Sequence, residues 1–92
     1  MKDIVYNIPL PLRSAVAEKL IDVILKSQNT SKMPSHLAKA ILLYWQKDEF
    51  ATEAGLQHLL EASAILEPEK TVSSMEELGL SEMALKLKEK LR

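Results

Sequence analysis

The segment Leu37–Trp45 restricts the folds open to this chain more than any other stretch, because eight of its nine residues are apolar and only Lys39 interrupts them. A helix built from this segment has apolar surface on nearly every side. Such a helix has to be enclosed by other elements, because water would otherwise meet its apolar side chains. The segment therefore predicts the central helix of a small bundle.

The composition favours helices over strands. Apolar residues make up 47% of the 92 residues, but only 4% are aromatic, and the chain has two glycines and four prolines. All-β domains usually need more turn residues and more β-branched or aromatic residues. A chain of this length is also expected to form one domain. We therefore expect an all-α fold, a small four-helix bundle-like domain over residues 1–92.

Local signals set the ends of the expected helices. Pro11 suits the first turn of a helix, Thr52 suits an N-cap, and Pro68 is expected to end a helix. Ser73 with Glu76 and Ser74 with Glu77 have the spacing of two overlapping capping boxes, which predicts a helix start there. The expected helices cover about 11–27, 34–48, 52–67 and 74–91, with a break at Gly79. Helical spacing predicts a core built on Leu37, Ile41, Leu42 and Trp45 and filled by Leu20, Ile24, Leu56, Leu59, Leu60, Leu87 and Leu91.

Residues 1–10 have a different pattern. The apolar residues Ile4, Tyr6 and Ile8 occupy every second position, and this period of two is typical of a strand. Pro9 and Pro11 exclude a central strand, because proline cannot donate a backbone hydrogen bond. We therefore expect an extended N-terminal arm that lies along the bundle or pairs with another chain.

Several classes of protein are disfavoured. The chain has no cysteine, which excludes disulfides and cysteine-ligated zinc. Its longest apolar run, Ala40–Trp45, is far shorter than the roughly 18 residues of a membrane span, and the first residues lack the apolar run of a signal peptide. We expect a soluble cytoplasmic protein with no membrane partner.

No motif predicts catalysis. His58 and Glu61 share a helix face, but a metal site needs a third ligand. With only Gly55 and Gly79, the chain has no glycine-rich phosphate loop. We therefore expect no enzyme activity and no catalytic, cofactor-binding or metal-binding residues.

The net charge of −1 conceals segregated charges. Residues 1–47 carry seven basic and three acidic residues, residues 48–82 carry one basic and nine acidic residues, and residues 83–92 carry four basic and one acidic residue. These segments either neutralise one another within the fold or attract partners of opposite charge.

Two sets of residues are candidates for contact with partners. The expected protein-binding residues are apolar residues of the arm and the edge of the central helix: Ile4, Tyr6, Ile8, Tyr44 and Trp45. The expected nucleic-acid-binding residues are the basic residues of the last helix: Lys86, Lys88, Lys90 and Arg92.

The order of elements over residues 3–48 resembles the ribbon-helix-helix family of DNA-binding proteins. A short alternating segment ends in Ile8-Pro9 and is followed by a helix, a polar loop and a second helix. The resemblance implies a homodimer whose two strands form a ribbon in the major groove, with Asp3, Val5 and Asn7 toward the bases.

Together these patterns favour a non-enzymatic accessory or adaptor subunit. It would act by binding another protein in a larger complex, or itself as a homodimer. Small helical accessory subunits occur in nucleic-acid machinery, including archaeal replicative DNA polymerase assemblies, and this chain is similar to them in size and class. The alternative is a dimeric DNA-binding regulator of the ribbon-helix-helix type.

Overall fold

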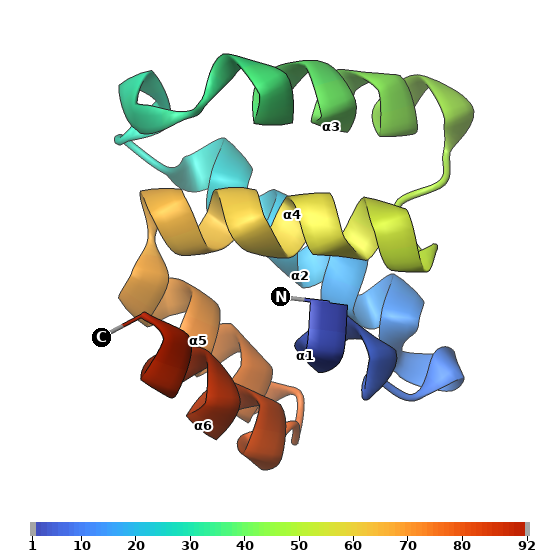
Figure 1. Cartoon of the computed structure of the whole chain (residues 1–92), viewed down its shortest axis with the longest axis vertical. Coiled ribbons are helices and arrows are strands. Elements are labelled where there is room, and N and C mark those ends of the chain that lie inside the picture. Colours follow the sequence, from blue (N-terminus) through green and yellow to red (C-terminus); the bar gives the residue numbers. More distant parts are fainter. Residues whose placement is uncertain (1, 92) are drawn as a thin grey trace.

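The structure, a computed structural model, describes residues 2–91, and every regular element in that range is helical, so the all-α class is confirmed (Figure 1). There are six α-helices in this range rather than the four expected. Two short 3-10 helices, Leu10–Leu12 and Thr30–Lys32, precede α2 and α3. The α-helices are α1 (Lys2–Tyr6), α2 (Arg13–Lys26), α3 (Ser35–Lys47), α4 (Glu53–Leu66), α5 (Pro68–Glu77) and α6 (Ser81–Lys90).

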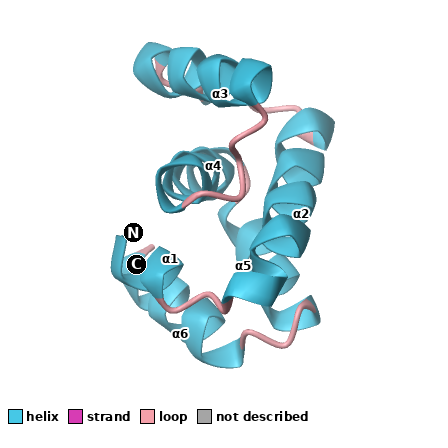
Figure 2. Ribbon diagram, turned by 90° about the vertical axis from the view of Figure 1, so that its right-hand side faces the viewer, coloured by secondary structure: helices cyan, strands magenta, loops and turns pink. Residues whose placement is uncertain are grey.

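The central helix is α4. It packs against α1, α2, α3 and α5, and Figure 2 shows it end-on with the other helices around it. Four of its buried positions hold small residues, which allow neighbouring helices to approach its backbone closely. Its buried residues are Gly55, Leu56, Leu59, Leu60, Ala62, Ser63, Ala64 and Leu66.

The expectation that the Leu37–Trp45 helix is central was therefore wrong. This helix, α3, lies at the edge of the fold and runs antiparallel to α4, its principal neighbour (Figure 1). Only Leu37 is buried, whereas Leu42 is 59% and Trp45 is 57% exposed. One neighbouring helix can cover only one side of α3, so the apolar residues on its other sides are exposed: Ala38, Leu42, Leu43 and Trp45.

The extended N-terminal arm was also wrong. Residues Lys2–Tyr6 form α1, which the Asn7 side chain closes by donating to the Asp3 carbonyl at 2.7 Å. Ile4 and Ile8, four residues apart, are 0% and 2% exposed. Their spacing fits one helical face as well as alternate positions of a strand. Ile4, Val5 and Ile8 therefore belong to the core, whereas Tyr6 is 55% exposed.

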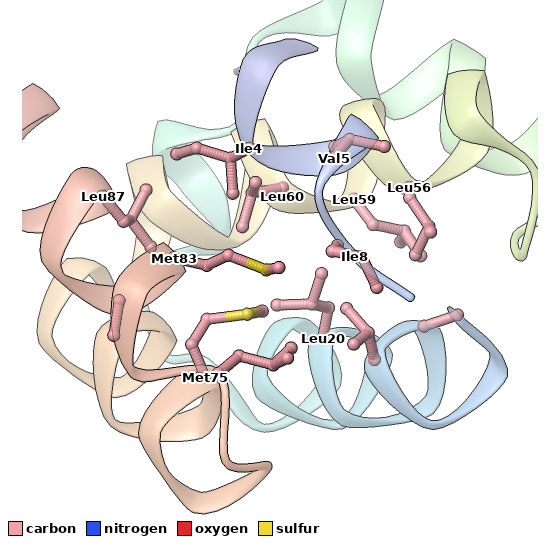
Figure 3. Close-up of a cluster of buried hydrophobic side chains, with 14 of the residues drawn as sticks. Ile4, Val5, Ile8, Leu20, Leu56, Leu59, Leu60, Met75, Met83 and Leu87 are labelled. Carbon is pink, nitrogen blue, oxygen red and sulfur yellow. The ribbon is translucent and has the colours of Figure 1, made fainter. Parts of the chain in front are cut away.

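The core lies between α4 and the N- and C-terminal elements (Figure 3). Ile4, Val5 and Ile8 enter it from one side, and α2, α5 and α6 close the others. The labelled side chains point toward one another: Ile4, Val5, Ile8, Leu20, Leu56, Leu59, Leu60, Met75, Met83 and Leu87. Leu91, expected in the core, is 37% exposed.

The last helical region differs from the sequence prediction at its start. Pro68 was expected only to end a helix, but it also occupies the first turn of α5, where its missing N–H is no loss. Residues 69–72, expected to be a connector, are helical, and Thr71 and Val72 are buried. At the other end of α5, Gly79 adopts a positive φ of 79°, a conformation suited to glycine.

The turn between α3 and α4 fixes the position of α3. Asp48 adopts a left-handed conformation with φ 54° and ends α3, and the N–H of Glu49 donates to the Tyr44 carbonyl at 3.1 Å. Thr52 then caps α4, because its hydroxyl accepts from the N–H of Gly55 at 3.1 Å. A Cβ at Gly55 would lie 2.9 Å from Phe50 Cα and would also clash with the Glu49 carbonyl oxygen.

Candidate protein-binding surface

Two parallel stripes of apolar residues run along α3. The first contains Leu37, Ile41 and Tyr44, which are buried or half-buried toward α4. The Tyr44 ring lies 6.5 Å from the Phe50 ring and 5.4 Å from the His58 ring, measured between ring centres. This stripe holds α3 against the rest of the molecule.

The second stripe begins one residue later and comprises Ala38, Leu42 and Trp45, which we call the outer α3 stripe. All three residues are exposed. Each of these residues follows a member of the first stripe by one position and therefore lies about 100° around the helix from it. The side chains of Leu42 and Trp45 are each more than half exposed, so together they give α3 an uncovered apolar surface within the described part of the chain.

The Trp45 ring lies next to the turn between α3 and α4. It meets the Phe50 ring edge-on, with the ring centres 6.0 Å apart. Phe50 lines a groove of about 270 Å³ together with Ala17 and Ile21 of α2. Phe50 therefore connects the outer α3 stripe to a groove between α2 and the α3–α4 turn.

The charges at the two ends of the outer α3 stripe have opposite signs. Lys32 and Lys39 are exposed toward its N-terminal end, and Asp48 and Glu49 are exposed beyond its C-terminal end. Within residues 2–91, no ion pair joins any of these four side chains to another. Glu18 of α2 lines the same groove as Asp48 and adds to the acidic end.

The structure separates the five residues expected to bind protein. Ile4 and Ile8 are in the core, so neither lies on a surface, and Tyr44 is half-buried against α4. Tyr6 is 55% exposed, but it borders a different groove, between α1 and α4. Trp45 alone of the five belongs to the outer α3 stripe.

The basic residues expected to bind nucleic acid differ in their surroundings. Lys86 and Lys88 are exposed on α6, whereas the Lys90 ammonium pairs with the Asp3 carboxylate at 3.3 Å. Arg92 lies outside the described residues. Other ion pairs also join segments of opposite charge, such as Arg13 with Glu53 at 3.4 Å.

Glu67 is the centre of a polar cluster that the sequence did not reveal. One of its oxygens, Oε2, accepts from Ser27 Oγ and from Asn29 Nδ2, both at 2.7 Å. These two hydrogen bonds, from Ser27 first, lower the pKa of Glu67, because they favour the charged carboxylate. The partners are about 40 residues apart in sequence, so no local pattern could have indicated the contact. The cluster joins the α2–α3 connection to the α4–α5 junction.

The remaining polar contacts serve the fold. His58 Nδ1 is 2.7 Å from the Ala54 carbonyl, and Ser63 Oγ is 2.5 Å from Thr71 Oγ1 in the interior. Among residues 2–91, no three His, Asp or Glu side chains are grouped so that they could hold a metal ion. None of the helices in this range combines the length and the apolar character needed to cross a bilayer.

The chain matches no known protein family, no curated protein and no solved structure.

Proposed function

We propose that this chain is a non-enzymatic accessory or adaptor subunit that binds protein through the outer α3 stripe. The observation that supports this proposal is the exposure of Leu42 and Trp45 on the same side of a well-formed helix. Apolar surface rimmed by polar residues is typical of sites that bind other proteins.

The chemistry of the stripe fits this role. Tryptophan is enriched among the residues that dominate binding energy in protein interfaces. Covering Leu42 and Trp45, each a little over half exposed, would contribute about 1 to 2 kcal/mol per side chain. The opposite charges at the two ends of the stripe would fix the direction in which a partner docks.

Affinity capture with matched variants tests the proposal. Trp45→Glu places a charge in the outer α3 stripe, whereas Leu85→Glu does the same at a residue that is 59% exposed on α6. The proposal predicts that proteins captured by the wild-type chain are also captured by Leu85→Glu and are lost with Trp45→Glu. Equal capture by both variants would contradict it.

The helical N-terminal segment argues against the ribbon-helix-helix alternative. Its DNA-reading strand would include Asp3 and Val5, and both residues are in helix α1. Val5 is also 2% exposed and so could not face a DNA groove. A setting in nucleic-acid machinery, such as a DNA polymerase assembly, stays part of the proposal through a protein partner.

A further inference from the structure

We infer that the protein bound by the outer α3 stripe is a second copy of this chain, in an antiparallel two-fold dimer. This inference rests on the proposed function, since it names the partner of the same surface. Three properties of the stripe support it: the sizes of its residues, the charges at its ends and the extent of its surface.

The sizes of the residues are self-complementary. In a two-fold dimer the same surface of both copies is used, so each contact occurs twice. An axis that passes α3 between Ile41 and Leu42 places Ala38 opposite the partner's Trp45. The small side chain of Ala38 leaves space for the indole ring, and the two copies of Leu42 meet beside the axis. A stripe with a large residue at both ends would not allow such close approach.

The charges favour the antiparallel direction. Residues 27–47 contain no acidic residue, and Asp48 and Glu49 follow immediately. Antiparallel pairing brings the basic end of one α3, at Lys32 and Lys39, beside the acidic end of the other. Parallel pairing would place like charges side by side. Lys47 lies 200° around the helix from Trp45, on the far side of α3, so it does not oppose this pairing.

The extent of the surface predicts weak association. The 13 residues of α3 span about 20 Å, and a stable interface usually needs roughly 800 Å² from each partner. The outer α3 stripe alone is too short to reach that area, so the interface would also need residues of α2 near Phe50, such as Ile21. We therefore expect a dissociation constant of about micromolar order.

Sedimentation equilibrium over a range of concentrations is the first test. The wild-type mass is expected to rise from the 10.3 kDa monomer toward twice that value as the concentration increases. Leu42→Glu is expected to raise the dissociation constant at least about tenfold. Leu85→Glu is the matched control, because Leu85 on α6 is exposed to the same 59%. Circular dichroism establishes that both variants are folded.

A charge exchange tests the direction of pairing. Lys32→Glu and Glu49→Lys are each expected to weaken the dimer by about threefold, and the two together are expected to restore it. Failure of the double variant to restore the dimer would overturn the antiparallel arrangement.

A monomer at every concentration, or a dimer as sensitive to Leu85→Glu as to Leu42→Glu, would overturn the inference. These outcomes are distinct from failure of the proposed function. If the chain stays monomeric but Trp45→Glu still abolishes capture of another protein, the stripe binds protein and its partner is not a second copy. If Trp45→Glu changes neither association nor capture, both proposals fail.

Discussion

Replacing Gly55 by alanine tests the close contact that positions α3 on α4. A Cβ at this position would lie 2.9 Å from Phe50 Cα and 3.1 Å from the Phe50 carbonyl oxygen, and would clash with the Glu49 carbonyl oxygen. All three atoms are backbone atoms, so no side-chain rotation can relieve the contact. The turn at residues 49–50 would have to move away from α4.

The expected magnitude follows from two opposing terms. Overpacking of this kind costs about 1 to 3 kcal/mol. Replacing glycine by alanine within a helix gains up to about 1 kcal/mol, and less in the first turn. We therefore expect Gly55→Ala to lower the free energy of unfolding by about 1 to 2 kcal/mol and to lower Tm by about 4 to 8 °C for each kcal/mol.

Thermal and urea unfolding followed by circular dichroism measure this change. The fluorescence of Trp45 gives a second readout, because its ring packs against Phe50 in the turn that has to move. Gly79→Ala is a useful comparison, since a Cβ there meets no atom within 4 Å and only the positive φ opposes it. A Gly55→Ala variant as stable as the wild type would refute the close approach of the turn to α4.

Three further predictions concern the core, the polar cluster and the basic helix. Leu59→Ala, in the core, is expected to destabilise the fold by about 2 to 5 kcal/mol. Leu42→Ala, at an exposed position, should change the free energy of unfolding by less than about 0.5 kcal/mol. Urea unfolding of both variants, at a concentration where the chain is monomeric, measures the difference. Because the pKa of Glu67 is lowered by folding, its contribution to stability is present above its unfolded pKa and is lost as the pH falls through the folded pKa. The Tm of the wild type should therefore fall more than that of Glu67→Gln on acidification, and parallel curves would contradict this assignment. Titration of labelled duplex and single-stranded DNA should show no binding at physiological salt, because Lys86 and Lys88 lie about 200° apart around α6 and Lys90 is paired with Asp3. Binding that falls steeply with salt would contradict this expectation.

The positions of helices were largely predictable from the sequence, because their ends depend on local signals. Thr52 caps α4 as expected, and Gly79 separates the last two helices. Pro68 shows the limit of this reasoning, since a proline that ends one helix can also begin the next. The N-terminal segment shows a second limit. Ile4, Tyr6 and Ile8 alternate as in a strand, but Ile4 and Ile8 are also four residues apart, which is about one helical turn.

The arrangement of the helices was not predictable in the same way. Hydrophobicity indicated that α3 could be buried, but it did not show which helix the others surround. The small residues Gly55, Ala62 and Ser63 made α4 the centre, because they let neighbouring helices approach from several sides. Of the candidate contact residues, only Trp45 is placed on the outer α3 stripe, and its neighbour Leu42 had been assigned to the core.

The fluorescence of Trp45 is the most direct test of the account, because it is the only tryptophan in the chain. We predict that in dilute solution the indole is readily quenched by iodide or acrylamide and emits at long wavelength, as its 57% exposure requires. At high concentration the emission should shift to shorter wavelength and quenching should decrease, and the Leu42→Glu variant should show neither change. A tryptophan already protected in dilute solution would contradict the exposed outer α3 stripe, and one that stays fully accessible at high concentration would contradict its pairing with a second copy.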